Sequence, residues 1–149
     1  MYQQIIVGVD GSDLADAALR HALEIARLSG GQVTAVTVTE PSTIVAPALD
    51  MIAVDTTNLF QELEKAKADG AADVLARARA VAGNTAIGAV HLPGRNTADG
   101  IREAIETAGA DLVVMGSHGR RGLGRLLLGS QAAEVLARSK VPVLIVKSA

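Results

Sequence analysis

Short apolar runs rich in Val and Ile recur along the chain, and longer amphipathic segments separate them. The runs lie at residues 4–10, 33–38, 85–92, 112–115 and 141–146. Between them, apolar side chains recur every three to four residues, the spacing of a helix with one buried face. Alternation of strands with helices is typical of a parallel α/β fold, because each right-handed crossover places a helix between two parallel strands. We therefore predict a doubly wound parallel sheet of five strands.

The interior of this sheet is expected to be aliphatic. Hydrophobic residues make up 49% of the 149 residues, but Tyr2 and Phe60 are the only aromatic ones. Val, Ile, Leu and Ala must fill the core, which suits a parallel sheet covered by alanine-rich helices. The length is that of one ordinary domain, and no repeat or boundary divides it. We expect residues 1–149 to form a single domain.

Charge and cysteine content exclude several classes of function. The net charge of −2 and the pI near 5.9 do not favour a nucleic-acid or membrane partner. The absence of cysteine excludes disulfides, thiolate metal sites and a cysteine nucleophile. Neither a signal segment nor an apolar run of about 18 residues is present. We expect a cytoplasmic protein.

The densest group of glycines follows the apolar run at residues 112–115. The five glycines of residues 116–131 are Gly116, Gly119, Gly122, Gly124 and Gly129. A helix pattern begins directly after them. Glycine lets backbone N–H groups approach an anion, and a helix N-terminus adds unpaired donors and a positive partial charge. This stretch is therefore interpreted as a phosphate-binding loop, the alternative being a tight turn without a ligand.

Two common glycine motifs do not fit this stretch. Gly124 and Gly129 have the spacing of a Walker A loop, but Ser130 stands where that loop needs lysine. The dinucleotide-binding pattern also fails, because Leu127 occupies the position of its third glycine. The spacing that fits is Gly116-x2-Gly119-x9-Gly129-Ser130.

With this glycine spacing, the chain resembles the nucleotide-binding branch of the universal stress protein family. Further landmarks are residues 5–12 (IIVGVDGS), 110–119 (ADLVVMGSHG) and 142–146 (PVLIV). The resemblance covers essentially the whole chain. It implies a Rossmann-like, adenine-nucleotide alpha-hydrolase-like fold with three α/β/α layers and strand order 3-2-1-4-5.

The resemblance also implies a nucleotide site. The residues it assigns to the nucleoside are Gly8, Val9, Asp10, Val38, Met115 and Gly116. Those assigned to the phosphates are Ser117, His118, Gly119, Arg120, Arg121, Gly129, Ser130 and Gln131. Asp10 is expected near the ribose, and Val38 is expected to meet adenine through its backbone. Arg120 or Arg121 can replace the missing lysine, because guanidinium groups bind phosphate well.

Three functions follow as hypotheses. The first is an ATP-binding regulator or sensor of the stress response, with ADP or AMP as alternative ligands. The second is a slow or partner-dependent ATPase, for which no sequence pattern assigns catalytic residues. The third is a nucleotide-free interaction protein, against which the intact glycines argue. We expect Mg²⁺ or Mn²⁺ to be held mainly by phosphates, because no acidic cluster indicates a protein-built metal site.

The last strand is expected to join two copies of the chain. Proteins of the family are usually homodimers through this strand, and an exposed edge of Val143, Leu144, Ile145 and Val146 would invite pairing. A further, unidentified protein partner is expected to recognise the nucleotide-bound form of the protein.

Two segments match no family motif. The connection at residues 39–57 is long and apolar, so it either packs against protein or covers the ligand. The turn at Gly94 is displaced by one residue from the family pattern, which leaves its role open.

Overall fold

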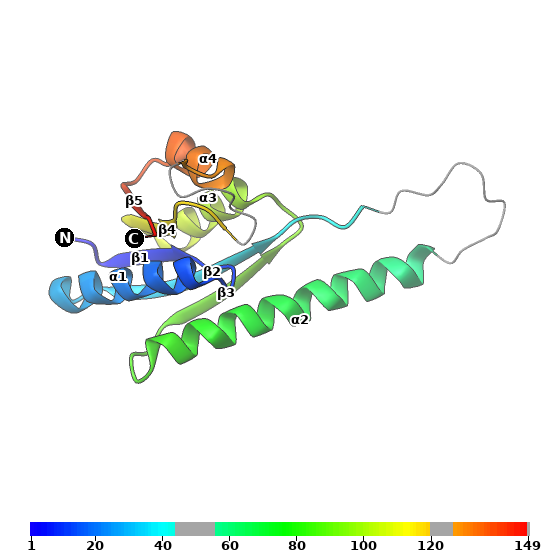
Figure 1. The fold of residues 1–149 in the computed structure, drawn as a ribbon, viewed down its shortest axis with the longest axis horizontal. Helices are drawn as coiled ribbons and strands as arrows, with labels where there is room; N and C mark the ends of the chain where they lie inside the picture. The colour runs from blue at the N-terminus through cyan, green and yellow to red at the C-terminus, as the bar shows by residue number, and fades with distance from the viewer. Residues whose placement is uncertain (44–55, 120–126, 149) are drawn as a thin grey trace.

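The computed structural model describes residues 1–43, 56–119 and 127–148. Its centre is a parallel sheet of five strands in the order β3-β2-β1-β4-β5 (Figure 1). The strands are β1 (Gln4–Gly8), β2 (Gln32–Thr39), β3 (Gly88–Pro93), β4 (Leu112–Gly116) and β5 (Val143–Val146). The predicted α/β class and the implied strand order are both confirmed.

Four helices cover the two faces of the sheet. They are α1 (Asp13–Ser29), α2 (Thr56–Ala82), α3 (Thr97–Ala108) and α4 (Ser130–Arg138). Helices α1 and α2 lie on one face, and α3 and α4 lie on the other (Figure 1). The winding changes sides between β1 and β4, which are direct neighbours in the sheet. This arrangement leaves a crevice beyond the carboxyl ends of these two strands, where doubly wound folds bind ligands.

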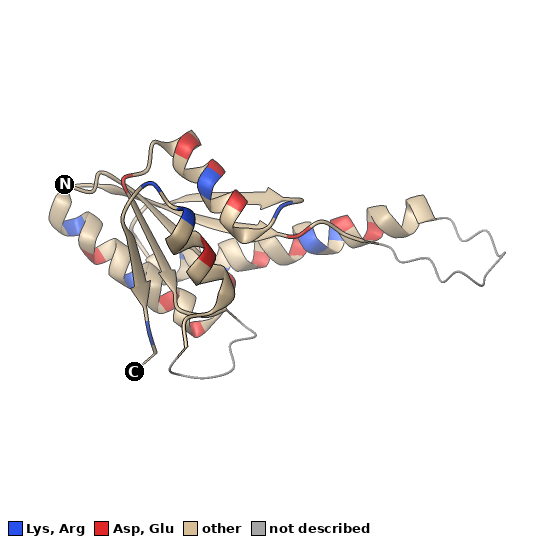
Figure 2. Ribbon diagram, turned by 90° about the horizontal axis from the view of Figure 1, so that it is seen from above, with Lys and Arg blue, Asp and Glu red and all other residues tan. Residues whose placement is uncertain are grey.

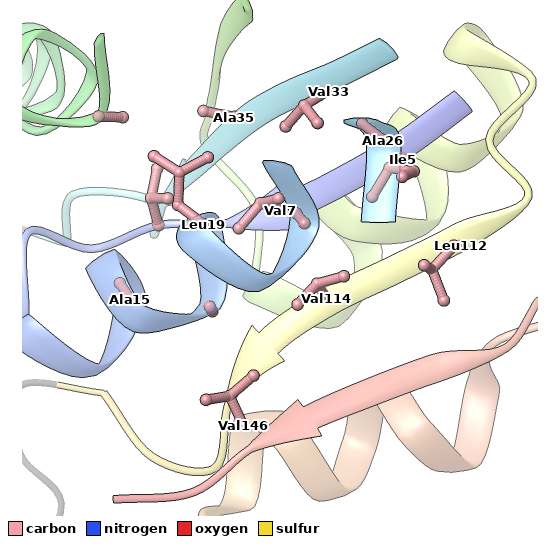
Figure 3. Packing of buried hydrophobic residues seen from close by; sticks show 14 of the residues in the cluster. Ile5, Val7, Ala15, Leu19, Ala26, Val33, Ala35, Leu112, Val114 and Val146 are labelled. Atoms are coloured by element: carbon pink, nitrogen blue, oxygen red, sulfur yellow. The ribbon is translucent and has the colours of Figure 1, made fainter. Parts of the chain in front are cut away.

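The described core is aliphatic, as predicted. On the α1 and α2 face, Ile5, Val7 and Val114 of the sheet pack against Ala15 and Leu19 of α1 (Figure 3). A second cluster fills the space beneath α3 and α4. No aromatic side chain is buried among the described residues. Small alanines on the helices let the helix backbones approach the branched side chains of the strands closely.

In the described part of the chain, the charged residues lie in the helices and connections, while the five strands contain none (Figure 2). This distribution follows from the covering of both faces, because a charged side chain on a central parallel strand would be buried without water. None of the described helices is long and apolar enough to cross a membrane.

Local signals set most helix ends. Ser12 precedes α1 and its hydroxyl accepts a hydrogen bond from the N–H of Ala15, while Asn96 plays the same role for α3. Gly30 and Gly109 end these helices in the left-handed conformation, with φ of 72° and 61°.

Three strands are shorter than the apolar runs that predicted them, and the first of these, β1, ends at Gly8 rather than residue 10. Strand β3 starts at Gly88 rather than residue 85, because Gly83 and the following turn end α2 first. Strand β5 starts at Val143, because Pro142 has no N–H to donate and Val141 donates its own to the Ser139 hydroxyl. Strand β3 lies at the sheet edge, as predicted.

Apolar spacing along α2 predicts one buried stripe, and that prediction is wrong in its first half. The stripe comprises Leu59, Leu63, Ala66, Val74, Ala78 and Val81. Leu59, Leu63 and Ala66 are exposed, whereas burial begins at Ala71 and continues through Leu75 and beyond. The reason is length. The 27 residues of α2 span about 40 Å, while the eight residues of β2 span about 26 Å. The helix therefore extends beyond the carboxyl edge of the sheet (Figures 1 and 2).

A single carboxylate joins the starts of two neighbouring strands. Asp111, just before β4, accepts hydrogen bonds from the backbone N–H groups of Gln3 (2.8 Å) and Gln4 (3.0 Å). These N–H groups, that of Gln3 first, hold the pKa of the Asp111 carboxyl below its ordinary value of 3.8, and desolvation opposes them only in part.

We predict that Asp111→Ala lowers the free energy of unfolding by about 1–2 kcal/mol at pH 7, because two N–H groups lose a charged acceptor. Urea titrations of both proteins measure this difference. A carboxyl with a lowered folded pKa stabilises the protein above the unfolded pKa, and this stabilisation is lost as the pH falls through the folded pKa. The difference in free energy of unfolding between wild type and Asp111→Ala should therefore decrease below about pH 4.

Asp73→Ala is the matched control, because Asp73 is exposed on α2. It should change the free energy of unfolding by less than about 0.5 kcal/mol. If the difference in free energy of unfolding between wild type and Asp111→Ala stayed constant down to pH 2, the Asp111 carboxylate would not be the charged acceptor for the N–H groups of Gln3 and Gln4.

Candidate functional site

A cavity of about 620 Å³ opens at the carboxyl ends of β1, β2 and β4. Its volume lies within the usual range for small-molecule sites. Segments far apart in the sequence form its walls: the β1–α1 connection, the end of β2, the first turn of α3, the loop after β4 and the start of α4. The fold thus brings the glycine-rich segment together with the first strand.

One end of the cavity is formed by the N-terminus of α4. Gly129 is the residue before this helix, and no side chain of a described residue caps it. Ser130 and Gln131, the first two helical residues, line the cavity. The first N–H groups of a helix have no partner within the helix, and they carry a positive partial charge. This end of the cavity is suited to an anion.

Gly129 is required by the packing of the loop itself. A Cβ atom at this position would lie 2.9 Å from the carbonyl oxygen of Ser117 and 3.1 Å from the Cα of His118. Both are backbone atoms, so the loop would have to move. The close approach also allows the Gly129 N–H to donate a 2.6 Å hydrogen bond to the Ser117 carbonyl. This glycine therefore fixes the position of α4 against the end of β4.

Ser117 connects three parts of the site. Its N–H donates to the carbonyl of Val146 at 2.8 Å, and its carbonyl accepts from Gly129. Its hydroxyl shares a 3.1 Å hydrogen bond with Nδ1 of His118. The residue is only 4% exposed, whereas His118 lines the cavity. Ser117 thus anchors the loop and orients the imidazole, with Nε2 left as the second ring nitrogen.

Asp10 faces the loop from the end of β1. One carboxylate oxygen accepts from the N–H of Ser12 at 2.9 Å. The other lies close to Gly119, where a Cβ atom would be 2.8 Å from it. Here the added atom would meet the end of a side chain rather than backbone. Gly119 therefore keeps space open between the loop and the carboxylate.

The opposite end of the cavity is formed by β2 and α3. Val36, Val38 and Ile101 give it apolar walls, and the side chains of Thr97 and Glu40 add polar groups. Helix α3 approaches β2 so closely that a Cβ on Gly100 would lie 2.5 Å from Cγ2 of Val38.

The turn at Gly94 holds this end of β2 in place. The N–H groups of Gly94 (2.8 Å) and Arg95 (3.3 Å) both donate to the carbonyl of Thr39. Gly94 has a φ of +74°, which favours glycine. The displaced glycine of the sequence therefore has a structural role beside the cavity.

The structure places most of the predicted site residues at one cavity. Those that line it are Gly8, Val9, Asp10, Val38, Met115, Gly116, His118, Gly119, Gly129, Ser130 and Gln131. Ser117 lies buried behind them. Arg120 and Arg121 lie outside the described residues, as does most of the connection at residues 39–57.

Sequence reasoning missed other residues that line the cavity. They are Ser12, Ala15, Val36, Glu40, Thr97, Ile101 and Ala132. Two of them had a usable signal: Glu40 follows Val38 at the two-residue spacing of one strand face, and Thr97 opens a helix at the carboxyl edge. Within residues 1–43, 56–119 and 127–148, no group of three or more acidic or His side chains could hold a metal ion.

Comparison with known proteins gives consistent matches over the full chain. The sequence model of the Universal stress protein family matches residues 1–147. A universal stress protein of Methanocaldococcus jannaschii is 35% identical over 150 residues, covering 99% of this chain and 83% of that protein. One of Thermus aquaticus is 34% identical over 147 residues, covering 99% and 100%.

Solved structures have the same fold. The universal stress protein UspA from Lactobacillus plantarum has a TM-score of 0.80 at 26% identity over 98% of each chain. A universal stress protein in complex with cAMP has a TM-score of 0.70 at 30% identity over 99% of each chain. The protein from Archaeoglobus fulgidus in complex with dAMP has a TM-score of 0.64 at 25% identity over 98% of each chain. By its sequence and its fold, the chain belongs to the universal stress protein family.

Proposed function

We propose that this protein binds an adenine nucleotide, ATP, in the cavity at the carboxyl edge of the sheet. The observation that carries the proposal is the shape of that cavity. An uncapped helix N-terminus and a glycine-bearing loop meet at one end, and apolar walls from β2 and α3 form the other. A nucleotide has the matching polarity, with anionic phosphates at one end and a flat base at the other.

Two further observations support an adenine ligand. Two universal stress proteins of similar fold were solved with cAMP and with dAMP, which both carry adenine. In this chain, the glycine at position 119 keeps space open beside Asp10, where a larger side chain would intrude. The site residues predicted from the sequence, including Arg120 and Arg121, are proposed to contact the nucleotide. Mg²⁺ or Mn²⁺ would be held mainly by the phosphates.

We further propose a regulatory role. Residues 1–149 would act as one nucleotide-binding domain in the cytoplasm, and the bound nucleotide would report a stress state to a protein partner. Such a role requires binding and not turnover.

The proposed function predicts direct binding of ATP. Isothermal titration calorimetry with Mg-ATP should give saturable binding. Ligand at a hundred times its dissociation constant should raise the free energy of unfolding by about 2.7 kcal/mol, which a melting curve detects. A folded protein that shows neither effect would favour a nucleotide-free interaction protein.

Gly119→Val should abolish this binding and leave the fold intact, because the new side chain meets the end of Asp10 and not the backbone. Gly70→Val is the matched control, since nothing lies within 4 Å of a Cβ at that exposed helical position. It should bind ATP as wild type does. Gly129→Val is unsuitable as a test of binding, because its side chain would displace the loop itself. If Gly119→Val bound ATP as tightly as wild type does, the proposed contact between this loop and the nucleotide would be wrong.

Asp10→Ala should weaken the binding of adenosine and the binding of ATP by a similar factor, because the Asp10 carboxylate is proposed to contact the ribose, which both ligands contain. Titration of both ligands into wild type and variant measures the two factors. A loss confined to ATP would instead place Asp10 at the phosphates or their metal ion, and it would contradict the ribose assignment.

We also propose a homodimer through β5. This strand lies at the sheet edge, and its exposed side includes Leu144, which is 37% exposed. An unprotected edge strand of apolar residues favours pairing with a second copy.

Leu144→Lys should convert the dimer to a monomer, because it places a charge at the edge without altering a buried side chain. Light scattering after size-exclusion chromatography measures the mass. The exposed Leu28→Lys on α1 is the control and should leave the mass unchanged. A monomeric wild type would exclude the proposed dimer.

A further inference from the structure

Among the residues that the structure describes, Glu40 is the acidic side chain at the end of the cavity formed by β2 and α3. We propose that the Glu40 carboxylate accepts a hydrogen bond from the amino group at C6 of the base, and so selects adenine over purines with an oxo group there. This inference rests on the proposed binding of a nucleotide. It names a residue that sets the specificity of that site.

The position of Glu40 follows from the strand that precedes it. Val38 faces the α3 side of the sheet and packs with Ile101 in the second core cluster. Two residues further along an extended chain, a side chain returns to the same face. Glu40 directly follows the last residue of β2, and the alternation of the strand places it on the face where Thr97 begins α3; both residues line the cavity.

The backbone around Glu40 is held from two sides. Its carbonyl accepts a hydrogen bond from the ammonium group of Lys67 on α2. The preceding carbonyl, that of Thr39, accepts from Gly94 and Arg95 of the turn before α3, and the Thr39 hydroxyl shares a 2.8 Å hydrogen bond with Nε2 of His91. Contacts from α2, β3 and the turn thus fix where the Glu40 side chain starts.

The carboxylate itself makes no hydrogen bond or ion pair with any residue that the structure describes. Both of its oxygens are available to a ligand. The apolar walls of Val36, Val38 and Ile101 can hold the faces of a purine, and the polar edge of the purine must then lie at the rim where Glu40 and Thr97 stand.

A carboxylate discriminates between amino and oxo groups because it only accepts hydrogen bonds. The amino group of adenine donates, whereas the oxygen of hypoxanthine would face the carboxylate lone pairs. Thr97 cannot make this distinction, because a hydroxyl both donates and accepts. Glu40 is an exposed residue, so water competes for it and the selection is expected to be moderate.

The test compares ATP with ITP. Adenine has an amino group at C6 and no proton on N1, whereas hypoxanthine, the base of ITP, has an oxo group at C6 and a proton on N1. Calorimetry at pH 7.5 with Mg²⁺ gives the ratio of the two affinities for wild type and for Glu40→Gln. Wild type should bind ATP about tenfold more tightly than ITP. In Glu40→Gln this ratio should fall about fivefold or more, because the amide can donate to an oxo group as well as accept from an amino group.

Glu62→Gln provides the matched control, with the same chemical change at an exposed position on α2. It should keep the wild-type ratio. An unchanged ratio of the two affinities in Glu40→Gln overturns the inference. If both affinities fall by the same factor, so that the ratio stays unchanged, the carboxylate acts on a part that the two nucleotides share, such as the sugar. A folded wild type that binds neither nucleotide overturns the proposed function itself, a result distinct from the other two.

Discussion

The fold depends on covering both faces of a sheet whose strands contain no charged residue. Central strands such as β1 and β4 are buried on each side, so helices must pack on both faces. Strands β1 and β4 are neighbours in the sheet, but the connection after β1 leads to a helix on one face and the connection after β4 leads to a helix on the other. The two connections therefore separate at the carboxyl ends of these strands. The cavity lies at that point. The cavity is therefore a consequence of the topology, and the local sequence determines only which side chains line it.

The glycines of the motif are needed for different reasons. At position 129 a side chain would strike the backbone of Ser117 and His118, so the residue fixes helix against strand. At position 119 it would strike the carboxylate of Asp10, so the residue keeps the cavity open. A common spacing thus combines the packing of the loop at one glycine with open space in the cavity at the other. Their substitution should accordingly have different effects, on folding in the first case and on affinity in the second.

Sequence periodicity predicted the α/β class and the alternation of strands and helices, because both depend on local pattern. The strand order and most of the cavity residues came instead from the resemblance to the universal stress protein family. Periodicity misjudged α2. Apolar spacing identifies the face that a helix would bury, but the length of the surface available to it depends on β2, a separate element. Thr97 and Glu40 were missed for a related reason, since only the packing of α3 against β2 brings them to one rim.

The unequal halves of α2 imply a gradient of local stability along one continuous helix. Residues 71–82 pack on the core, so their amide hydrogens should exchange mainly through global unfolding. Residues 56–70 include no buried side chain, and a helical segment of that length is marginal in water on its own. Gly70, at the boundary, weakens the helix further by about 1 kcal/mol relative to alanine. The projecting turns should therefore exchange by local opening, orders of magnitude faster than the turns beside them.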